Sequence, residues 1–299
     1  MTQRMTEQNN RRSENFSEKS TLEMLQIINE EDKTIALAVE KSLPAIAKAA
    51  DLAVTNLRKG GRMFYVGAGT SGRLGIVDAG ELPCTFGVEH DTVQAIIAGG
   101  PTAVYDAAMG DEDDKECGES EMTQRSVGSS DVIVGITASG RTPYVLGAIE
   151  AGKRLGAVTI GICNNSDSPL AKAADVAIVA DTGPEVIEGS TRMKAGTSQK
   201  MILNMLSTVI MSQLGYVYKN YMVRMVPNNE KLYARAIHIT SKCTGEDEST
   251  CEKVLKESGW KIDEAIVMLA CGVDNQNASR LLEENQHVVG KVLKVNGEK

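Results

Sequence analysis

The chain has 299 residues, of which 42% are hydrophobic and 24% charged, and its formal net charge is −8 at pH 7. This length allows one large domain and a smaller one. The acidic balance disfavours binding to nucleic acid or to an anionic membrane surface, because phosphate groups repel an acidic face. A small anionic ligand remains compatible with it, since backbone N–H groups at a helix N-terminus bind phosphate without bulk positive charge.

The six cysteines include no C-x-x-C pair, and the three histidines are far apart in the sequence. This pattern is typical of reduced thiols in a cytoplasmic protein and predicts no metal site. The polar N-terminal stretch has no signal-peptide pattern, and polar residues interrupt the most apolar helical stretch. We therefore expect no membrane span and a cytoplasmic location.

The first 60 residues are predicted to form an N-terminal helical segment. Residues 1–19 are polar, and we expect them to be extended or poorly ordered. From residue 21 to residue 57, apolar side chains recur at helical spacing. Two helices fit this stretch best, divided near Leu43-Pro44, because a proline is disfavoured inside a helix.

Five short runs rich in valine and isoleucine follow, each succeeded by small residues and then by a helical stretch. Continuous apolar strands between helices indicate a parallel sheet buried on both faces, and hence a three-layer α/β domain. We place this domain at residues 61–226, closed by a long helix at 194–214. The five runs lie at 63–66, 93–97, 132–136, 158–162 and 176–179.

After Pro227 the sequence holds no further strand candidate, only short helical stretches separated by Gly259-Trp260 and Gly272. Residues 227–299 are therefore predicted to form a small helical domain, with Trp260 as its core anchor. This domain is similar in kind to a ubiquitin-associated three-helix bundle, and we infer no ubiquitin binding from that.

Two loops of similar composition follow the first and third predicted strands, at residues 67–73 (GAGTSGR) and 137–143 (TASGRTP). Both lie at the edge of the sheet where open α/β sheets bind ligands. Glycine lets the backbone approach a phosphate, hydroxyls donate hydrogen bonds, and the helix dipole favours negative charge. Either loop alone could be a tight turn, but two together favour a phosphate site. The expected binding residues are Thr70, Ser71, Gly72, Ser139, Gly140, Arg141 and Thr142.

The first loop also matches the dinucleotide pattern G-x-G-x-x-G through Gly67, Gly69 and Gly72. That fingerprint requires an acidic residue about 20 residues further on, at the end of the second strand, to hold the ribose. Here the second predicted strand ends in the sequence IAGG at residues 97–100, without a carboxylate. The dinucleotide interpretation is therefore disfavoured.

A third segment, residues 183–194, follows the last predicted strand at the same edge of the sheet. It is either a helix cap with surface charge or part of a sugar-binding rim. The candidate binding residues in it are Glu185, Glu188, Ser190, Thr191 and Lys194.

These segments resemble the N-acetylmuramic acid 6-phosphate etherase family, which has the sugar-isomerase (SIS) fold. The resembling stretches are TLEMLQIINEED (21–32), GAGTSGRLGIVDAGELPCTF (67–86), ASGRTPYV (138–145) and EVIEGSTRMKAGTSQKMILNML (185–206). The GELP and EGSTRMKAGT motifs are much more specific than the phosphate loops. At Cys84 the sequence departs from the family, which usually has a second proline there.

The resemblance implies an enzyme that binds a phosphorylated amino sugar and cleaves its C3 lactyl ether with water. The products would be N-acetylglucosamine 6-phosphate and D-lactate, formed during recycling of cell-wall sugar in the cytoplasm. The resemblance further implies a homodimer, with neither a metal nor a redox cofactor.

The family's two catalytic glutamates correspond to Glu81, as the general acid, and Glu112, as the base. An unactivated ether resists hydrolysis, but a ring-opened sugar has a C1 aldehyde that acidifies the C2 proton, so lactate can leave from C3. Carboxyl groups can serve as the acid and the base of such a route. Without the resemblance, Glu81 would be a surface glutamate, and the residues alone do not favour Glu112 over Asp111, Asp113 or Asp114.

Two other functions are compatible with this fold: a non-catalytic regulator that senses sugar phosphates, as the related glucokinase regulatory proteins do, and an aldose–ketose isomerase. Those regulators have two SIS domains, whereas this chain has room for one. Neither alternative would release lactate.

Overall fold

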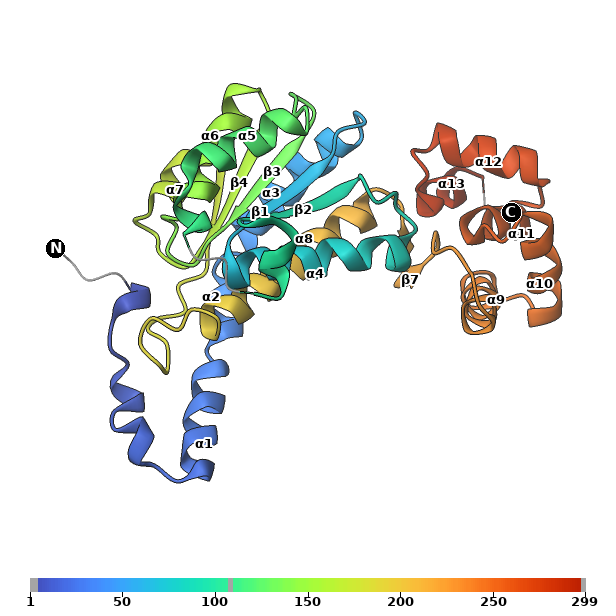
Figure 1. The fold of residues 1–299 in the computed structure, drawn as a ribbon. Helices are drawn as coiled ribbons and strands as arrows, with labels where there is room; N and C mark the ends of the chain where they lie inside the picture. The colour runs from blue at the N-terminus through green and yellow to red at the C-terminus, as the bar shows by residue number, and fades with distance from the viewer. Residues whose placement is uncertain (1–4, 107–109, 297–299) are drawn as a thin grey trace. The chain divides into compact units, whose positions relative to one another are not determined.

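A computed structural model of the chain describes residues 5–106 and 110–296 (Figure 1). The chain divides into two compact units. The first, which we call the sheet unit, is Met1–Gly80 with Asp91–Ser207, and the second, the C-terminal unit, is Glu81–His90 with Thr208–Lys299. The N-terminal helices thus belong to the same unit as the sheet, and residues 208–226 belong with the C-terminal helices.

The predicted parallel sheet is confirmed. Five strands pair in parallel in the order β2-β1-β3-β4-β5. Every residue of β1 and β3 is buried, as their uninterrupted apolar sequence predicts. The strands span Met63–Gly67 (β1), Val93–Ile97 (β2), Val132–Ile136 (β3), Val158–Cys163 (β4) and Val176–Val179 (β5).

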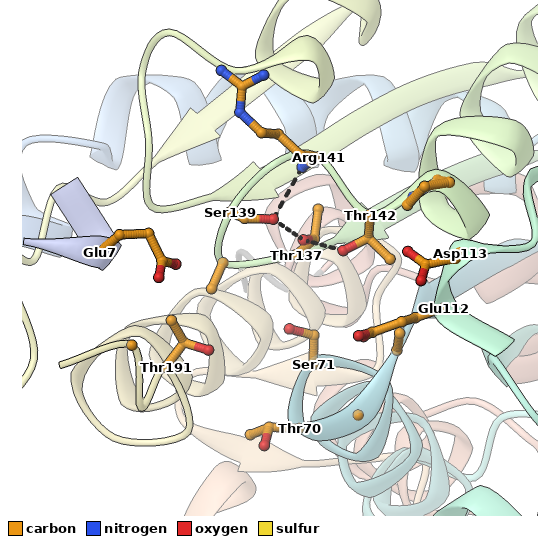
Figure 2. Close-up of a pocket in the computed structure, with 15 residues that line it drawn as sticks. Glu7, Thr70, Ser71, Glu112, Asp113, Thr137, Ser139, Arg141, Thr142 and Thr191 are labelled. Atoms are coloured by element: carbon orange, nitrogen blue, oxygen red, sulfur yellow. Dashed lines mark hydrogen bonds between the residues drawn. The ribbon is translucent and has the colours of Figure 1, made fainter. Parts of the chain in front are cut away.

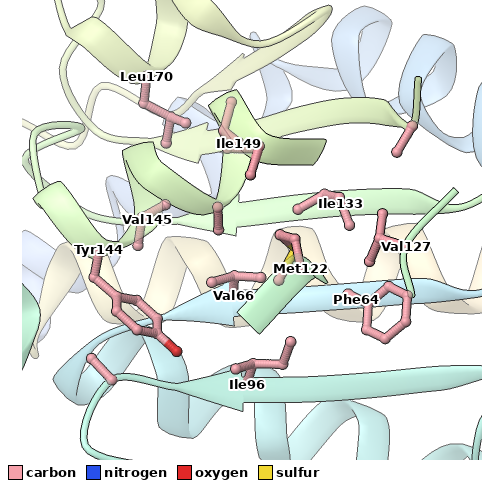
Figure 3. Close-up of a cluster of buried hydrophobic side chains, with 14 of the residues drawn as sticks. Phe64, Val66, Ile96, Met122, Val127, Ile133, Tyr144, Val145, Ile149 and Leu170 are labelled. Carbon is pink, nitrogen blue, oxygen red and sulfur yellow. The ribbon is translucent and has the colours of Figure 1, made fainter. Parts of the chain in front are cut away.

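Helices pack on both faces of the sheet, which gives the predicted three layers. Because successive strand residues point to opposite faces, Phe64 and Val66 pack with Val145 of α6 in one apolar cluster (Figure 3). Between them in sequence, the Tyr65 hydroxyl donates a 2.9 Å hydrogen bond to Asp78 of α4 on the other face. The helices are α3 (Leu43–Leu57), α4 (Gly69–Phe86), α5 (Lys115–Gln124), α6 (Pro143–Arg154), α7 (Pro169–Ala173) and α8 (Lys194–Gln213); the last residues of α4 and α8 belong to the C-terminal unit.

The N-terminal segment is more ordered than its polar composition predicts. Three short 3-10 helices follow one another: η1 (Met5–Glu7), η2 (Arg11–Ser13) and η3 (Phe16–Glu18). The expectation of an extended or poorly ordered segment is therefore wrong for the described part of 1–19. The reason is that three of its polar residues, Thr6, Asn10 and Ser13, are buried. Ser13 Oγ, for example, donates a 2.7 Å hydrogen bond to the carbonyl of Val186.

Residues 21–57 form three helices instead of the expected two: α1 (Thr21–Asp32), α2 (Ile35–Glu40) and α3. The break near Leu43-Pro44 is confirmed, since α3 begins at Leu43 with Pro44 in its first turn. A second break at residues 33–34 carries no proline or glycine, so the sequence gives no sign of it.

The C-terminal unit is helical, as predicted, with one addition that the sequence did not reveal. Its two-residue strands β6 (Val217–Tyr218) and β7 (Tyr221–Met222) pair antiparallel. Five helices follow: α9 (Glu230–Thr244), α10 (Glu248–Glu257), α11 (Ile262–Cys271), α12 (Asn275–Glu284) and α13 (Val289–Asn296). In the described parts of the chain, no helix combines the length and apolarity needed to cross a membrane.

Candidate functional site

A cavity of about 510 Å³ opens at the carboxyl ends of β1 and β3 in the sheet unit, and we call it the strand-end cavity (Figure 2). Its walls come from the first turn of α4, the loop after β3, the short helix η5 (Asp111–Asp113), the loop before α8, and η1. The two glycine-and-hydroxyl loops predicted from the sequence therefore meet at one cavity. The lining residues are Glu7, Ala68, Gly69, Thr70, Ser71, Glu112, Asp113, Thr137, Ala138, Ser139, Arg141, Thr142, Pro143, Gly189 and Thr191.

The first loop is tight because two glycines let α4 approach β1. A Cβ on Gly67 would lie 2.6 Å from the backbone nitrogen of Gly72, and a Cβ on Gly72 would lie 2.6 Å from Ile97 Cγ1. Gly72, a predicted binding residue, thus permits this packing and is not among the lining residues. The same packing aims the N-terminus of α4, with Thr70 and Ser71, at the cavity.

The second loop presents a connected row of hydroxyls before α6. Thr137 Oγ1 lies 2.7 Å from Thr142 Oγ1 and 3.3 Å from Ser139 Oγ (Figure 2). Ser139 Oγ also accepts a 3.2 Å hydrogen bond from the backbone N–H of Arg141. Because Ser139 accepts at this point, its own proton remains available for Thr137 or for a ligand. A row of hydroxyls at a helix N-terminus is suited to hold an anion.

Gly140 shapes this loop from outside the cavity. Its φ is +67°, a conformation that side chains disfavour, and a Cβ would lie 2.4 Å from the Ser168 side chain. The neighbouring Arg141 is exposed and lines the cavity, while its Nη2 donates a 3.3 Å hydrogen bond to the carbonyl of Asp167.

The acidic run at 111–114 divides into two carboxylates that reach the cavity and two that do not. Glu112 and Asp113 are exposed lining residues, and Figure 2 shows the Glu112 carboxylate pointing into the cavity. Asp114 accepts a 2.8 Å hydrogen bond from the N–H of Cys117 and so caps α5. Asp111 is not among the lining residues. Of the four acidic residues considered as the base, Glu112 and Asp113 are the two that line the strand-end cavity.

Two candidates of the third segment are buried beside the cavity. The Glu185 carboxylate accepts 2.9 Å hydrogen bonds from the N–H groups of Lys194 and Ala195, at the start of α8. Lys194 Nζ lies 2.6 Å from Glu31 Oε2 of α1, and the side chains of this pair are 3% and 5% exposed. Glu185 and Lys194 thus hold the start of α8 in place, and neither lines the strand-end cavity.

The pKa values of the two buried carboxyl groups, Glu185 and Glu31, are shifted in opposite directions. Burial raises the pKa of Glu185 above its ordinary value, against the lowering effect of the two backbone hydrogen bonds. Burial also acts to raise the pKa of Glu31, but hydrogen bonds from Lys194 and Asn10 outweigh it, so the pKa of Glu31 is lowered. Glu31 is therefore held as a carboxylate opposite the Lys194 ammonium.

The remaining residues of the third segment, 183–194, differ in whether they line the strand-end cavity. Thr191 and Gly189 line the strand-end cavity. Glu188 is exposed, and its carboxylate accepts a 3.4 Å hydrogen bond from Asn9 Nδ2. The N–H of Ser190 donates to the carbonyl of Ile187 within a turn. Of the five candidates in this segment, only Thr191 is placed at the cavity.

Glu81 belongs to the C-terminal unit, on the last turns of α4, and is exposed. The Cys84 thiol lies 3.8 Å from Glu81 Oε2, so the residue that departs from the family pattern contacts the predicted acid directly. Glu81 is not among the residues that line the strand-end cavity.

Eight lining residues were not predicted as binding or catalytic residues: Glu7, Ala68, Gly69, Asp113, Thr137, Ala138, Pro143 and Gly189. All of them except Glu7 lie in segments that the sequence analysis singled out, and Thr137 could have been predicted as a binding residue because it is the first hydroxyl residue after a predicted strand. Nothing in the polar N-terminal stretch points to Glu7. Among residues 5–106 and 110–296, His, Cys, Asp and Glu side chains form no group of three or more that could hold a metal ion.

The fold and the strand-end cavity define an SIS-domain protein, and family comparisons agree. Residues 118–209 match the SIS domain, and residues 45–153 match the glucokinase regulatory protein N-terminal SIS domain. Residues 219–267 match the C-terminal lid domain of glucokinase regulatory protein.

Curated relatives identify the particular family. N-acetylmuramic acid 6-phosphate etherase from Symbiobacterium thermophilum is 57% identical over 254 residues, covering 85% of this chain and 84% of the relative. The protein of the same name from Clostridioides difficile is 46% identical and covers 97% of this chain and 95% of the relative. That from Serratia proteamaculans is 48% identical, with coverage of 90% and 91%. The chain belongs to the N-acetylmuramic acid 6-phosphate etherase family.

Proposed function

We propose that this protein cleaves the lactyl ether of N-acetylmuramic acid 6-phosphate with water, giving N-acetylglucosamine 6-phosphate and D-lactate. Membership of the etherase family supports N-acetylmuramic acid 6-phosphate as the substrate. The observation that carries the proposal is the strand-end cavity itself, where the Glu112 carboxylate points into the same cavity as the hydroxyls of two glycine-containing loops. A carboxylate base beside an anion seat suits proton abstraction from a sugar phosphate.

The 6-phosphate would sit at the N-terminus of α6, against the hydroxyls of Ser139 and Thr142. These hydroxyls lie at the start of a twelve-residue helix, whose dipole favours negative charge there. Thr70 and Ser71 of α4 would contact the ligand beside this seat. Gly72, Gly140, Glu185 and Lys194 would act indirectly, by shaping the loops that carry the binding residues.

The reaction would proceed through the ring-opened sugar. Glu112 would take the C2 proton, the C3–oxygen bond would break, and Glu81 would protonate the departing lactate oxygen. Water would then add at C3 of the unsaturated aldehyde, and a proton would return to C2, so that the overall change is hydrolysis of the ether. The position of Glu112 in the cavity supports its role as base, whereas the role of Glu81 is supported by the GELP motif alone.

An enzymatic lactate assay on the purified protein tests this proposal. N-acetylmuramic acid 6-phosphate should yield one equivalent of D-lactate. The matches to glucokinase regulatory protein domains favour a sugar-phosphate-sensing regulator as the second candidate. A regulator would bind the sugar without turnover, and an isomerase would convert an aldose to a ketose without releasing lactate.

We also infer that two copies of the chain associate and that the protein works in the cytoplasm, in recycling of cell-wall sugar. Exposed leucines on the N-terminal helices support the association: Leu22 and Leu25 of α1 are 64% and 56% exposed, and Leu37 of α2 is 60% exposed. Large apolar side chains gathered on a surface are typical of protein–protein contact.

A further inference from the structure

A second cavity, of about 530 Å³, lies in the C-terminal unit, and we call it the C-terminal cavity. Its walls come from Gly87, the segment after β7, the turn between α10 and α11, and the helices α9, α11 and α12. All of these residues belong to the C-terminal unit, and the proposed reaction uses none of them. Small-molecule sites typically measure about 300–1,000 Å³, so this cavity has the size of a binding site.

Trp260 and Tyr233 form an aromatic wall of the C-terminal cavity. Their ring centroids lie 4.5 Å apart, and the two rings meet edge to face at 65°. Trp260, predicted as the core anchor, packs against the apolar cluster of this unit but is only half-buried, and Tyr233 is 36% exposed. The wall therefore presents aromatic surface to a ligand.

The backbone holds two side chains of the C-terminal cavity in a conformation that non-glycine residues disfavour. Trp260 has a φ of +65° and His287 a φ of +58°. Their N–H groups donate 2.6 Å hydrogen bonds to the carbonyls of Leu255 in α10 and Leu282 in α12. Left-handed backbone at bulky residues is enriched at ligand sites. The ends of two helices thus fix Trp260 and His287 at the cavity.

Charged residues of the C-terminal cavity pair with one another. Lys261 Nζ lies 2.9 Å from Glu264 Oε1, and Arg224 Nε lies 3.5 Å from Asp263 Oδ2. Asp263 Oδ1 also accepts a 2.9 Å hydrogen bond from the N–H of Glu264, in the first turn of α11. A carboxylate of the chain therefore already occupies the N-terminus of α11, which disfavours an anionic ligand there.

Hydrogen-bonding groups of both kinds remain available to a ligand. Arg224 stacks over the Tyr216 ring, with its guanidinium carbon 4.5 Å from the ring centroid, and it donates no side-chain hydrogen bond to another described residue. Asp263 is a buried acceptor beside it, and Glu283 of α12 is an exposed one. Donors and acceptors beside aromatic rings suit a ligand with hydroxyl groups, because each hydroxyl both donates and accepts.

We propose that the C-terminal cavity binds an uncharged sugar ring, as a second site in addition to the strand-end cavity. The C–H groups on one face of the ring would pack on Trp260 and Tyr233, since the face of an aromatic ring is negative. Hydroxyls would donate to Asp263 and Glu283 and accept from Arg224. The proposal is independent of the etherase activity, because the two cavities share no lining residue.

Trp260 provides the measurement, because it is the only tryptophan of the chain and lines this cavity. N-acetylglucosamine, titrated into the full-length protein, should change the tryptophan fluorescence until the site is saturated. Tetramethylammonium tests for a cation site, and glycerol tests for hydroxyls without a ring. Both should half-saturate at concentrations at least about tenfold higher. A comparable or tighter response to either probe, or no saturation by N-acetylglucosamine, would overturn the proposal.

Two neighbouring glutamates of α12 provide a matched pair of variants. Glu283→Gln alters an acceptor of the cavity and should weaken N-acetylglucosamine about 3–10-fold, as expected for one hydrogen bond. Glu284→Gln is the control and should bind as the wild type does, because Glu284 pairs with Arg280 and does not line the cavity.

Tyr233→Leu tests the aromatic wall without a change of charge. It removes a partly exposed ring, so the protein should stay folded by circular dichroism while its affinity for N-acetylglucosamine falls at least as far as in Glu283→Gln. Unchanged affinity in either variant would show that the sugar binds elsewhere. Binding is measured without turnover, so a failure to release lactate would leave this result unaffected.

Discussion

At the scale of single residues, the most direct prediction concerns Glu112, the proposed base. Glu112→Gln removes a proton acceptor while keeping the shape and hydrogen-bonding capacity of the side chain. We expect turnover to fall about 10²–10⁴-fold and exchange of the C2 proton with deuterated solvent to stop, while binding of substrate changes little. Asp113→Asn is the control, because Asp113 lines the same cavity from the same short helix. Normal C2 exchange in Glu112→Gln would assign the base elsewhere.

The predicted acid should give a different kinetic signature. Glu81→Gln should slow lactate release strongly, but C2 exchange should continue, since proton abstraction precedes departure of lactate in the proposed order. Deuterium incorporation and lactate release, measured in one reaction, separate the two steps. Glu89→Gln provides a control, as Glu89 is an exposed glutamate of the same unit. Equal loss of both steps in Glu81→Gln would contradict a role confined to the leaving group.

The phosphate seat predicts a change in apparent affinity. Ser139→Ala should raise KM for the phosphorylated sugar several-fold with a smaller effect on kcat, because the lost hydrogen bond serves substrate and transition state alike. The unphosphorylated sugar should be a poor substrate of the wild type, and Ser139→Ala should affect it little. Equal activity on the two sugars would count against a phosphate seat at α6.

Residues that line the strand-end cavity could be singled out from the sequence where they lie next to a strand end. Ser139 and Thr142 were expected there, and they line the cavity, because a strand, a glycine and a helix start are local features. The buried role of Lys194 could not be found, because its partner Glu31 lies 163 residues away and nothing local distinguishes a buried lysine from an exposed one. The packing role of Gly72 and Gly140 could not be predicted either, since close packing is invisible until the neighbouring element is known.

At the scale of elements, Asp131 links the starts of two central strands. It accepts hydrogen bonds from the backbone N–H and the guanidinium of Arg62, which precedes β1, and from the N–H of Gly128. Burial acts to raise the pKa of Asp131, but these hydrogen bonds outweigh it and lower the pKa below 3.8. The folded protein therefore holds the carboxylate more strongly than the unfolded chain does.

The lowered pKa of Asp131 predicts how the free energy of unfolding depends on pH. Asp131→Asn should lower the free energy of unfolding by about 1–3 kcal/mol at pH 7, measured by urea denaturation. The deficit should shrink as the pH falls below 3.8, through the lowered pKa, because the wild type loses the same charge there. Asp167→Asn is the control: its ion pair with Lys172 is exposed, so little change is expected. A deficit that stays constant with pH would exclude the charge as its cause.

Helices and strands were predicted well where a pattern of apolar side chains marks them in the sequence. All five strands follow from runs of valine and isoleucine, because a strand covered on both faces must be apolar along its length. The three N-terminal 3-10 helices and the β6–β7 pair were missed for the opposite reason. Each is only two or three residues long, so no periodic pattern of apolar residues marks it.

At the scale of the whole molecule, the two compact units do not coincide with the domains predicted from the sequence. The sequence places a boundary at 226/227, where strand candidates end, whereas α4 and α8 each run from the sheet unit into the C-terminal unit. A boundary inside a continuous helix leaves no glycine, proline or change in composition for sequence analysis to find. The end of α4 that falls in the C-terminal unit includes the buried Leu82 and Phe86.

Assembly is best tested by substitutions that leave both units complete. The wild type should sediment at about twice its monomer mass of 32.0 kDa. Leu22→Asp combined with Leu25→Asp should shift it to the monomer, because charge on an apolar contact must be desolvated without a partner. These leucines are exposed within one chain, so their replacement should not disturb the fold.

Val295→Asp is the control, since Val295 is 74% exposed on α13 of the C-terminal unit, and that variant should stay dimeric. A wild-type protein that is monomeric and fully active at micromolar concentration would refute the role assigned to the N-terminal helices.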